Sequence, residues 1–137
     1  MFLIKHMKKI LIFPFSNQLG TIIPSITIGN LLKKNNYHVV FACNGKYTQI
    51  LLEKGFEVVS IDEVSYTYYR ENVDHNSMQF YSKELVRFMV DAEVQLIQKE
   101  NPDLIIGHNR PTLYISSKLA RKKYINITVA SLTNFYD

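Results

Sequence analysis

The stretch FPFSNQLGTIIP, residues 13–24, determines how the fold is interpreted. It follows a nearly continuous apolar run at residues 8–15 and leads into a segment with helical apolar spacing at residues 22–34. A strand that turns through a polar loop into a helix is the opening unit of an α/β domain, where ligands bind beside the carboxyl ends of the strands. We therefore expect Thr21 to cap the helix and the loop to border a binding site.

The rest of the chain alternates in the same way. Further strands are predicted at residues 37–43, 56–61, 103–107 and 125–132, and further helices at 46–54, 78–99 and 111–123. The inner face of the third of the four helices is predicted to carry Met78, Tyr81, Leu85, Phe88, Met89, Ala92 and Leu96. Strict alternation predicts a Rossmann-like, three-layer αβα fold with a parallel sheet, and right-handed crossovers give the strand order 3-2-1-4-5. The length predicts a single domain over residues 1–137.

Composition narrows the classes of function. The chain of 137 residues has a net charge of +4 and a single cysteine, Cys43, which indicates a buried thiol, a reducing compartment and a cytoplasmic location. The lysine and arginine clusters suit helix C-termini or contact with anionic lipid headgroups, that is, a peripheral membrane contact. They are not interleaved with stacking aromatic residues, so we expect no nucleic-acid binding. Four scattered histidines and one cysteine predict no metal site.

The first loop excludes two common kinds of phosphate site. It contains neither G-x-G-x-x-G nor G-K-[ST], because Gly20 is its only glycine. What remains is a helix N-terminus with polar neighbours, which suits a hydroxyl, a carboxylate or a phosphate. The predicted strand order brings His108 and Asn109, at the end of the fourth strand, next to Thr21.

Four short motifs carry a family resemblance. They are GTIIP at 20–24, NYHVVF at 36–41, GFEVVSI at 55–61 and NPDLII at 101–106. In this order the chain resembles, over most of residues 8–132, the N-terminal, acceptor-side domain of GT-B glycosyltransferases of the UDP-glycosyltransferase-like type. The resemblance implies transfer of a sugar from a nucleotide-sugar, a UDP-sugar, to a hydroxyl acceptor. It also implies that the donor binds to a second domain absent from this chain, so that no cofactor is expected here and the chain is inactive alone.

The resemblance also points to site residues. The family usually has a histidine, or in some branches an aspartate, after the loop glycine, and this residue deprotonates the acceptor. This chain has Thr21 there, which is not a base near neutral pH. His108 has the chemistry of a base, so His108 and Thr21 are the candidate catalytic pair. The candidate acceptor-binding residues are Asn17, Gln18, Gly20, Thr21, Tyr66, Tyr68, Tyr69 and Asn109.

Three interpretations stay open at this point. The chain is a fragment or truncated product of a glycosyltransferase, and an enzyme only when combined with a donor-binding C-terminal domain or partner subunit. Alternatively it is a non-catalytic subunit of a split glycosyltransferase that recruits the acceptor or the membrane. The third interpretation is a flavodoxin-like module that binds a phosphate-bearing ligand. A homo-oligomer is compatible with each of them.

Overall fold

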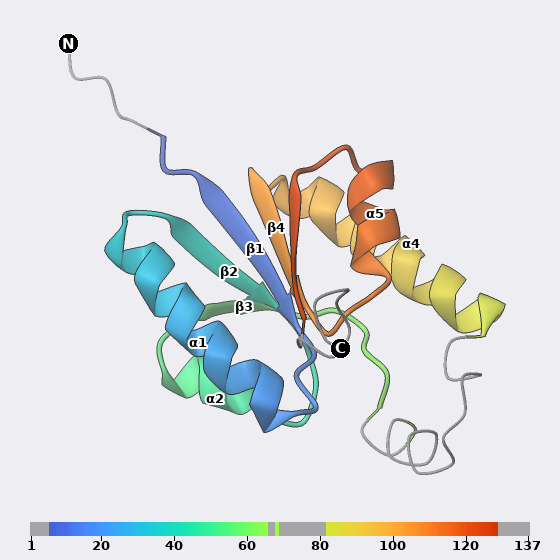
Figure 1. Ribbon diagram of the computed structural model, residues 1–137, viewed down its shortest axis with the longest axis horizontal. Helices are drawn as coiled ribbons and strands as arrows, with labels where there is room; N and C mark the ends of the chain where they lie inside the picture. The colour runs from blue at the N-terminus through green and yellow to red at the C-terminus, as the bar shows by residue number, and fades with distance from the viewer. Residues whose placement is uncertain (1–5, 66–67, 69–81, 129–137) are drawn as a thin grey trace, which may run out of the picture.

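The computed structural model describes residues 6–65, 68 and 82–128 (Figure 1). This part of the chain forms a five-stranded parallel sheet in the order β3-β2-β1-β4-β5. The strands are β1 (Lys9–Pro14), β2 (His38–Ala42), β3 (Glu57–Val59), β4 (Leu104–His108) and β5 (Tyr124–Ile127). The Rossmann-like fold class and the strand order predicted from the sequence are confirmed.

The central strand β1 is apolar along its whole length because helices cover both of its faces. Its residues Ile10 to Phe13 are at most 2% exposed. Ile10 pairs with Val39 of β2 on one side and with Leu104 of β4 on the other. β1 therefore holds the two halves of the sheet together.

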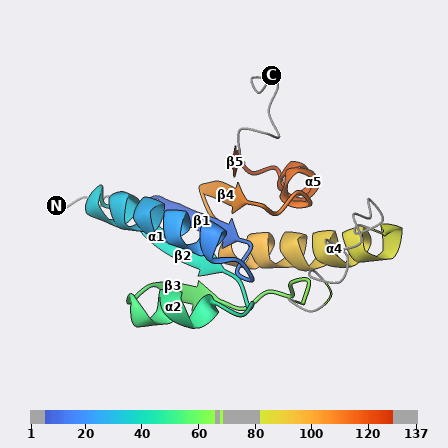
Figure 2. The same ribbon diagram turned by 60° about the horizontal axis from the view of Figure 1, so that its bottom comes forward.

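The first helical layer consists of α1 (Leu19–Lys34) and α2 (Thr48–Glu53), which lie together on one side of the sheet (Figures 1 and 2). Beneath it, the rings of Phe41 and Phe56 meet edge to face, with centroids 4.9 Å apart. A Cβ atom on Gly29 of α1 would lie 2.9 Å from the Phe56 ring, so only glycine fits at this helix–sheet contact without displacing the ring.

The second layer consists of α4 (Lys83–Glu100) and α5 (Leu113–Leu119). The Ser82 side chain caps α4 by accepting a hydrogen bond of 3.1 Å from the backbone N–H of Leu85. The residues of α4 that face the protein interior are Met89, Val90, Glu93 and Ile97. The predicted inner face is thus partly wrong: Phe88 is 54% exposed, and Met78 and Tyr81 lie outside the described residues. The physical reason is that α4 turns Glu93 inward toward Arg110, Thr112 and Ser116.

The start of α1 also differs from the prediction. Gln18 is the N-cap and makes no side-chain capping bond, whereas Thr21 lies inside the first turn and is buried. The prediction that Thr21 caps the helix is wrong because the helix begins at Leu19, and the N–H groups of Thr21 and Ile22 both donate to the Gln18 carbonyl.

Within the described residues, no helix is both long and apolar enough to cross a membrane.

Candidate functional site at the carboxyl edge of the sheet

The candidate site lies where β1 and β4 end side by side. Pro14 at the end of β1 pairs with His108 at the end of β4, and the N–H of Phe15 donates to the His108 carbonyl at 2.9 Å. The loops that follow the two strands therefore border the same edge. This adjacency confirms the neighbouring strand positions predicted from the sequence.

Four side chains, from α1, from the end of β4 and from the loop after β4, meet at this edge. Asn109 Nδ2 donates to the Thr21 hydroxyl at 3.3 Å, and Ser25 Oγ donates to the Thr21 carbonyl at 2.7 Å. Ser25 Oγ also lies 3.3 Å from Nδ1 of His108. The structure thus brings Thr21, His108 and Asn109 together as the strand order predicts, and adds Ser25, which sequence reasoning missed.

The contacts of His108 favour one tautomer of its ring. The Ser25 hydroxyl has one proton and gives it to the Thr21 carbonyl, so Nδ1 of His108 is the donor toward Ser25 Oγ. Nε2 then carries the lone pair. His108 as a whole is only 6% exposed.

Burial keeps this imidazole neutral. Desolvation lowers the pKa of His108 below its usual 6.5, and a hydrogen bond to the Thr21 backbone acts in the opposite direction with a smaller effect. A neutral ring with a lone pair on Nε2 has the protonation state of a general base at pH 7.

Asn109 has an unusual backbone conformation. Its φ is 56°, in the left-handed region, which asparagine tolerates better than most residues. Asn36, Asn101 and Arg121 have the same conformation outside the candidate site. In this conformation Asn109 donates from Nδ2 to the Thr21 hydroxyl.

The predicted loop residues are not equally accessible. Asn17 is buried: its Nδ2 donates to the Val64 carbonyl at 2.7 Å, and its Oδ1 accepts from the N–H of Lys46 at 2.8 Å. Gln18 is half-buried, and Gly20 is exposed with no atom within 4 Å of where a Cβ would lie.

The tyrosine-rich segment is described only in part. Tyr68 is 38% exposed, and its N–H donates to Ser65 Oγ at 3.1 Å. Tyr66 and Tyr69 lie outside the described residues. Their predicted contact with an acceptor stays a prediction.

A buried charged cluster lies behind this edge, which sequence reasoning missed. Arg110 donates from Nε to Glu93 Oε1 at 2.7 Å, and Thr112 Oγ1 donates to the same oxygen at 2.6 Å. Ser116 donates to the second oxygen of Glu93. Glu93 is fully buried and Arg110 nearly so. The available signal was a glutamate inside an apolar helix face and an arginine directly after a strand end.

The cluster extends through Arg110 to the loop after β3. The guanidinium group lies 3.6 Å from Glu63 and donates to the Asp62 carbonyl at 2.9 Å. Glu63 in turn accepts from the Ser16 backbone at 3.1 Å and from the Asn44 N–H at 2.8 Å. One arginine and two glutamates therefore tie the loops after β1, β2, β3 and β4 to α4.

Comparison with known proteins gives sequence relatives. No family model matches the chain. The PGL/p-HBAD biosynthesis rhamnosyltransferase of Mycobacterium bovis (strain BCG / Pasteur 1173P2) is 27% identical over 123 residues, which are 90% of this chain and 27% of that protein. The inactive PGL/p-HBAD biosynthesis glycosyltransferase of the same organism is 25% identical over 112 residues, which are 82% of this chain and 30% of that protein. The chain therefore spans less than a third of the length of these relatives.

The solved structures agree on the fold. The glycosyltransferase SnogD of Streptomyces nogalater matches 89% of this chain and 34% of its own, with a TM-score of 0.62 and 17% identity. SsfS6 of Streptomyces sp. SF2575 matches 88% of this chain and 39% of its own, with a TM-score of 0.62 and 19% identity. The chain forms a GT-B glycosyltransferase-like domain.

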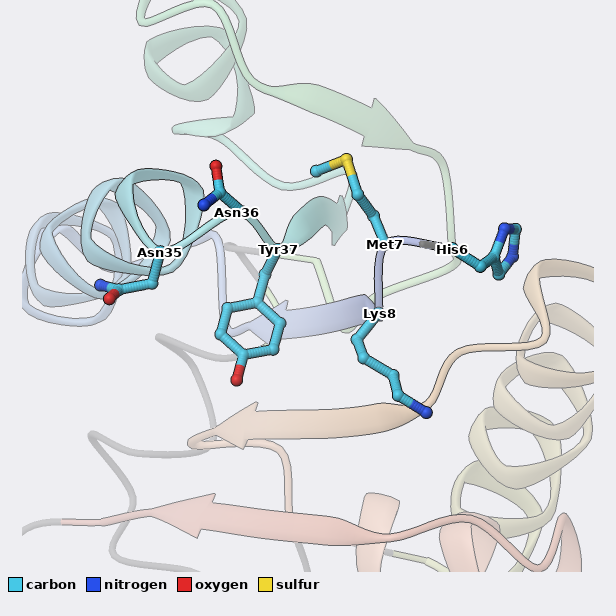
Figure 3. A pocket seen from close by; sticks show the side chains of 6 residues that line it. All are labelled: His6, Met7, Lys8, Asn35, Asn36 and Tyr37. Carbon is cyan, nitrogen blue, oxygen red and sulfur yellow. The ribbon is translucent and has the colours of Figure 1, made fainter. Parts of the chain in front are cut away.

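A pocket of about 360 Å³ lies at the opposite edge of this GT-B glycosyltransferase-like domain (Figure 3). It is formed at the amino ends of β1 and β2 and at the C-terminus of α1. The residues that line it are His6, Met7, Lys8, Asn35, Asn36 and Tyr37. Because it is separated from Thr21 and His108 by the length of β1, it is not part of the candidate site.

In the described part of this GT-B glycosyltransferase-like domain, no group of three or more histidine, cysteine, aspartate or glutamate side chains is placed to bind a metal ion. Cys43 is buried, and desolvation raises the pKa of its thiol to about 11. The thiol is therefore protonated at neutral pH and is not a nucleophile.

Proposed function

We propose that this chain is the acceptor-binding part of a cytoplasmic glycosyltransferase that moves a sugar from a nucleotide-sugar, a UDP-sugar, to a hydroxyl acceptor. The observation that carries the proposal is the meeting of Thr21, His108 and Asn109 at the carboxyl edge of a GT-B glycosyltransferase-like domain. The rhamnosyltransferase name of a 27% identical relative supports the reaction class.

The donor-binding domain belongs to another part of the protein or to a partner subunit. The matched region is only 27% of the rhamnosyltransferase and 34% of SnogD, so each of those proteins has room for a second domain. On this proposal the 137 residues bind the acceptor but do not transfer sugar alone.

In the proposed reaction the acceptor hydroxyl lies against His108, and the buried Thr21 hydroxyl positions Asn109 beside it. The proton of the acceptor hydroxyl passes to Nε2 of His108, whose Nδ1–H is held by Ser25 and the Thr21 backbone. The acceptor oxygen then forms a bond to the anomeric carbon of the sugar, and the bond from that carbon to the nucleoside diphosphate breaks. Gln18, Gly20, Asn109 and Tyr68 are the described residues proposed to contact the rest of the acceptor.

Asn17 takes a different part in this proposal. Its amide is engaged with the Val64 carbonyl and the Lys46 N–H, so it shapes the loop that carries Gln18. A direct contact of Asn17 with an acceptor requires that one of these two bonds opens.

The test joins this chain to the C-terminal part of a matched glycosyltransferase and measures sugar transfer to a hydroxyl acceptor. We expect His108→Ala to reduce kcat about 10²- to 10⁴-fold, the usual contribution of a general base, with little change in KM. Thr21→Ala should mainly raise KM. The matched control is His38→Gln, which replaces a histidine at the start of β2, at the other edge of the sheet.

Two results would contradict the proposal. Turnover of a UDP-sugar by the 137 residues alone would show that no second domain is needed. Unchanged kcat in His108→Ala, with the fold intact by circular dichroism, would exclude His108 as the base.

A second candidate function is a non-catalytic subunit that recruits the acceptor. It is favoured by Thr21 at the position of the family's base and by a 25% identical relative named as inactive. Acceptor binding by the joined protein in isothermal titration, without transfer and without any effect of His108→Ala, would support this alternative.

A further inference from the structure

The loop after β3 carries a buried carboxylate that touches both loops of the candidate site. The Glu63 side chain is 3% exposed. Its Oε1 accepts from the N–H of Ser16 at 3.1 Å, and its Oε2 accepts from the Ser16 hydroxyl. Oε1 also lies 3.6 Å from Nη1 of Arg110. Glu63 therefore connects the loop after β1, which contains Ser16, to the loop after β4, which contains Arg110.

The position of the loop after β1 sets where α1 begins. Only Asn17 separates Ser16 from Gln18, the N-cap of α1. The inner side of α1 packs Ile22 and Ile26 on the sheet. Apolar packing is non-directional, so it does not by itself fix how far the helix lies along the strands. The hydrogen bonds of the loop that precedes α1 supply that restraint.

The position of α1 in turn affects the His108 ring. Sheet pairing holds the His108 backbone, because the N–H of Phe15 donates to its carbonyl at 2.9 Å. The ring, in contrast, contacts α1, since Nδ1 lies 3.3 Å from Ser25 Oγ. A shift of α1 along the sheet would therefore open the contact between His108 and Ser25 and let water reach the ring.

The loop after β2 closes around the same carboxylate. The N–H of Asn44 donates to Glu63 Oε2 at 2.8 Å, and the N–H of Gly45 donates to Ser16 Oγ at 2.6 Å. A Cβ atom on Gly45 would lie 2.9 Å from the carbonyl carbon of Ser16 and closer still to its hydroxyl. Because backbone atoms are in the way, only glycine fits here without displacing the loop after β1.

We propose that Glu63 is a positioning residue for His108. By holding the loop after β1 against the loop after β4, it keeps the first turns of α1 in contact with the His108 ring. A carboxylate suits this role because both of its oxygens accept hydrogen bonds, here from backbone N–H groups of two different loops. The effect on sugar transfer rests on the proposed function, whereas the placement of the ring does not.

The first test measures how accessible the His108 ring is in the 137-residue chain. Diethylpyrocarbonate acylates neutral imidazole rings that it can reach, and mass spectrometry of the peptides gives the rate at each histidine. His108 is 6% exposed and should react slowly, whereas His38, with a side chain 43% exposed, should react fast. In Glu63→Gln an amide donor faces one of the two N–H groups, so the His108 rate should rise several-fold while the His38 rate stays the same.

Two further variants separate positioning from a general loss of stability. Gly45→Ala leaves every charge in place but displaces the loop after β1, so it should raise the His108 rate as Glu63→Gln does. The matched control is Glu100→Gln, which replaces a partly buried carboxylate 2.7 Å from Lys9 at the other edge of the sheet. Its His108 rate should equal that of the unmodified chain.

The second test measures sugar transfer by the chain joined to the C-terminal part of a matched glycosyltransferase. Glu63→Gln should lower kcat about 10- to 100-fold with a smaller change in KM, because a displacement of about 1 Å can cost about 10²-fold. The variant should fold, since Arg110 keeps Glu93 as a partner at 2.7 Å. Glu100→Gln should leave kcat and KM unchanged.

The two tests distinguish failure of this inference from failure of the proposed function. An unchanged His108 rate in folded Glu63→Gln, or an equal rise in Glu100→Gln, overturns the inference. If Glu63→Gln does not fold, an unchanged His108 rate in Gly45→Ala overturns it instead. A faster His108 rate in both loop variants, together with no sugar transfer by the unmodified joined protein, supports positioning by Glu63 and contradicts only the proposed function.

Discussion

Removing the charge of Glu93 should destabilise the domain more than any exposed charge change. In Glu93→Gln the side chain keeps its shape, but Arg110 Nε, now 2.7 Å from a carboxylate oxygen, is left with a neutral amide oxygen as its partner. The guanidinium group is then left with Glu63 at 3.6 Å while it stays 2% exposed. Leaving a buried charge short of its partner is costly because water cannot replace the lost carboxylate.

The expected loss is about 4 kcal/mol in the free energy of unfolding. Two unit charges about 4 Å apart interact by about 4 kcal/mol at an effective dielectric constant of 20, and breaking buried pairs typically costs about 3–5 kcal/mol. For a domain of this size the loss corresponds to a fall in Tm of about 12 °C. Urea unfolding followed by circular dichroism, and thermal melting, measure the two quantities.

The matched control is Glu57→Gln. Glu57 forms an exposed pair with His38, with 2.8 Å between Oε2 and Nε2, and such pairs contribute less than about 1 kcal/mol. Arg110→Met alone should also cost more than Glu93→Leu/Arg110→Met, because the double variant leaves neither Glu93 nor Arg110 as a buried unpaired charge. A loss below about 1 kcal/mol in Glu93→Gln would refute the reasoning.

Three further predictions concern other parts of the domain. Gly20→Ala should stabilise the domain by about 0.5–1 kcal/mol, because a Cβ there meets no atom within 4 Å. Gly29→Ala should destabilise the domain, because its Cβ would lie 2.9 Å from the Phe56 ring. Urea midpoints that move in the same direction for both variants would contradict this prediction. The Cys43 thiol, with its pKa raised to about 11, should resist alkylation at pH 8 until denaturant is added, and rapid labelling of the native protein would disprove its burial. The pKa of His108 is lower in the folded than in the unfolded state. The stability that the neutral His108 ring contributes is therefore complete above about pH 6.5 and is lost as the pH falls through the folded pKa. His108→Gln should reduce this loss of stability at acid pH in melting experiments, and an unchanged pH dependence of Tm would contradict the prediction.

The order of the strands was predictable because it depends on patterns that the backbone imposes. Continuous apolar runs such as residues 10–13 are easily distinguished from the spaced apolar residues of a helix. Right-handed crossovers then leave few possible orders for five parallel strands. The same reasoning placed His108 and Asn109 beside Thr21. These positions follow from connectivity and do not require knowledge of any side-chain contact.

The charged cluster was not predictable in the same way. Glu93 interrupts an apolar helix face, and its partner Arg110 is 17 residues away along the chain. Nothing in the sequence pairs the two, since the pairing depends on the rotation of α4 relative to β4. The start of α1 was missed for a similar reason: Leu19 and Gly20 carry no capping signal, and the helix begins there because the Gln18 carbonyl accepts its first bonds.

The pairing of β1 with β4 has a consequence for synthesis on the ribosome. Ile10 pairs with Leu104, 94 positions later, so the central strand lacks one neighbour until most of the chain has been made. At about 5–20 residues per second this wait lasts about 5–20 seconds. During that time Leu11, Phe13 and Val40, whose face later packs against Ile97 and Leu113, have no helix to cover them. Until α4, β4 and α5 have been made, this face of the half-sheet is open to solvent and to other apolar surfaces.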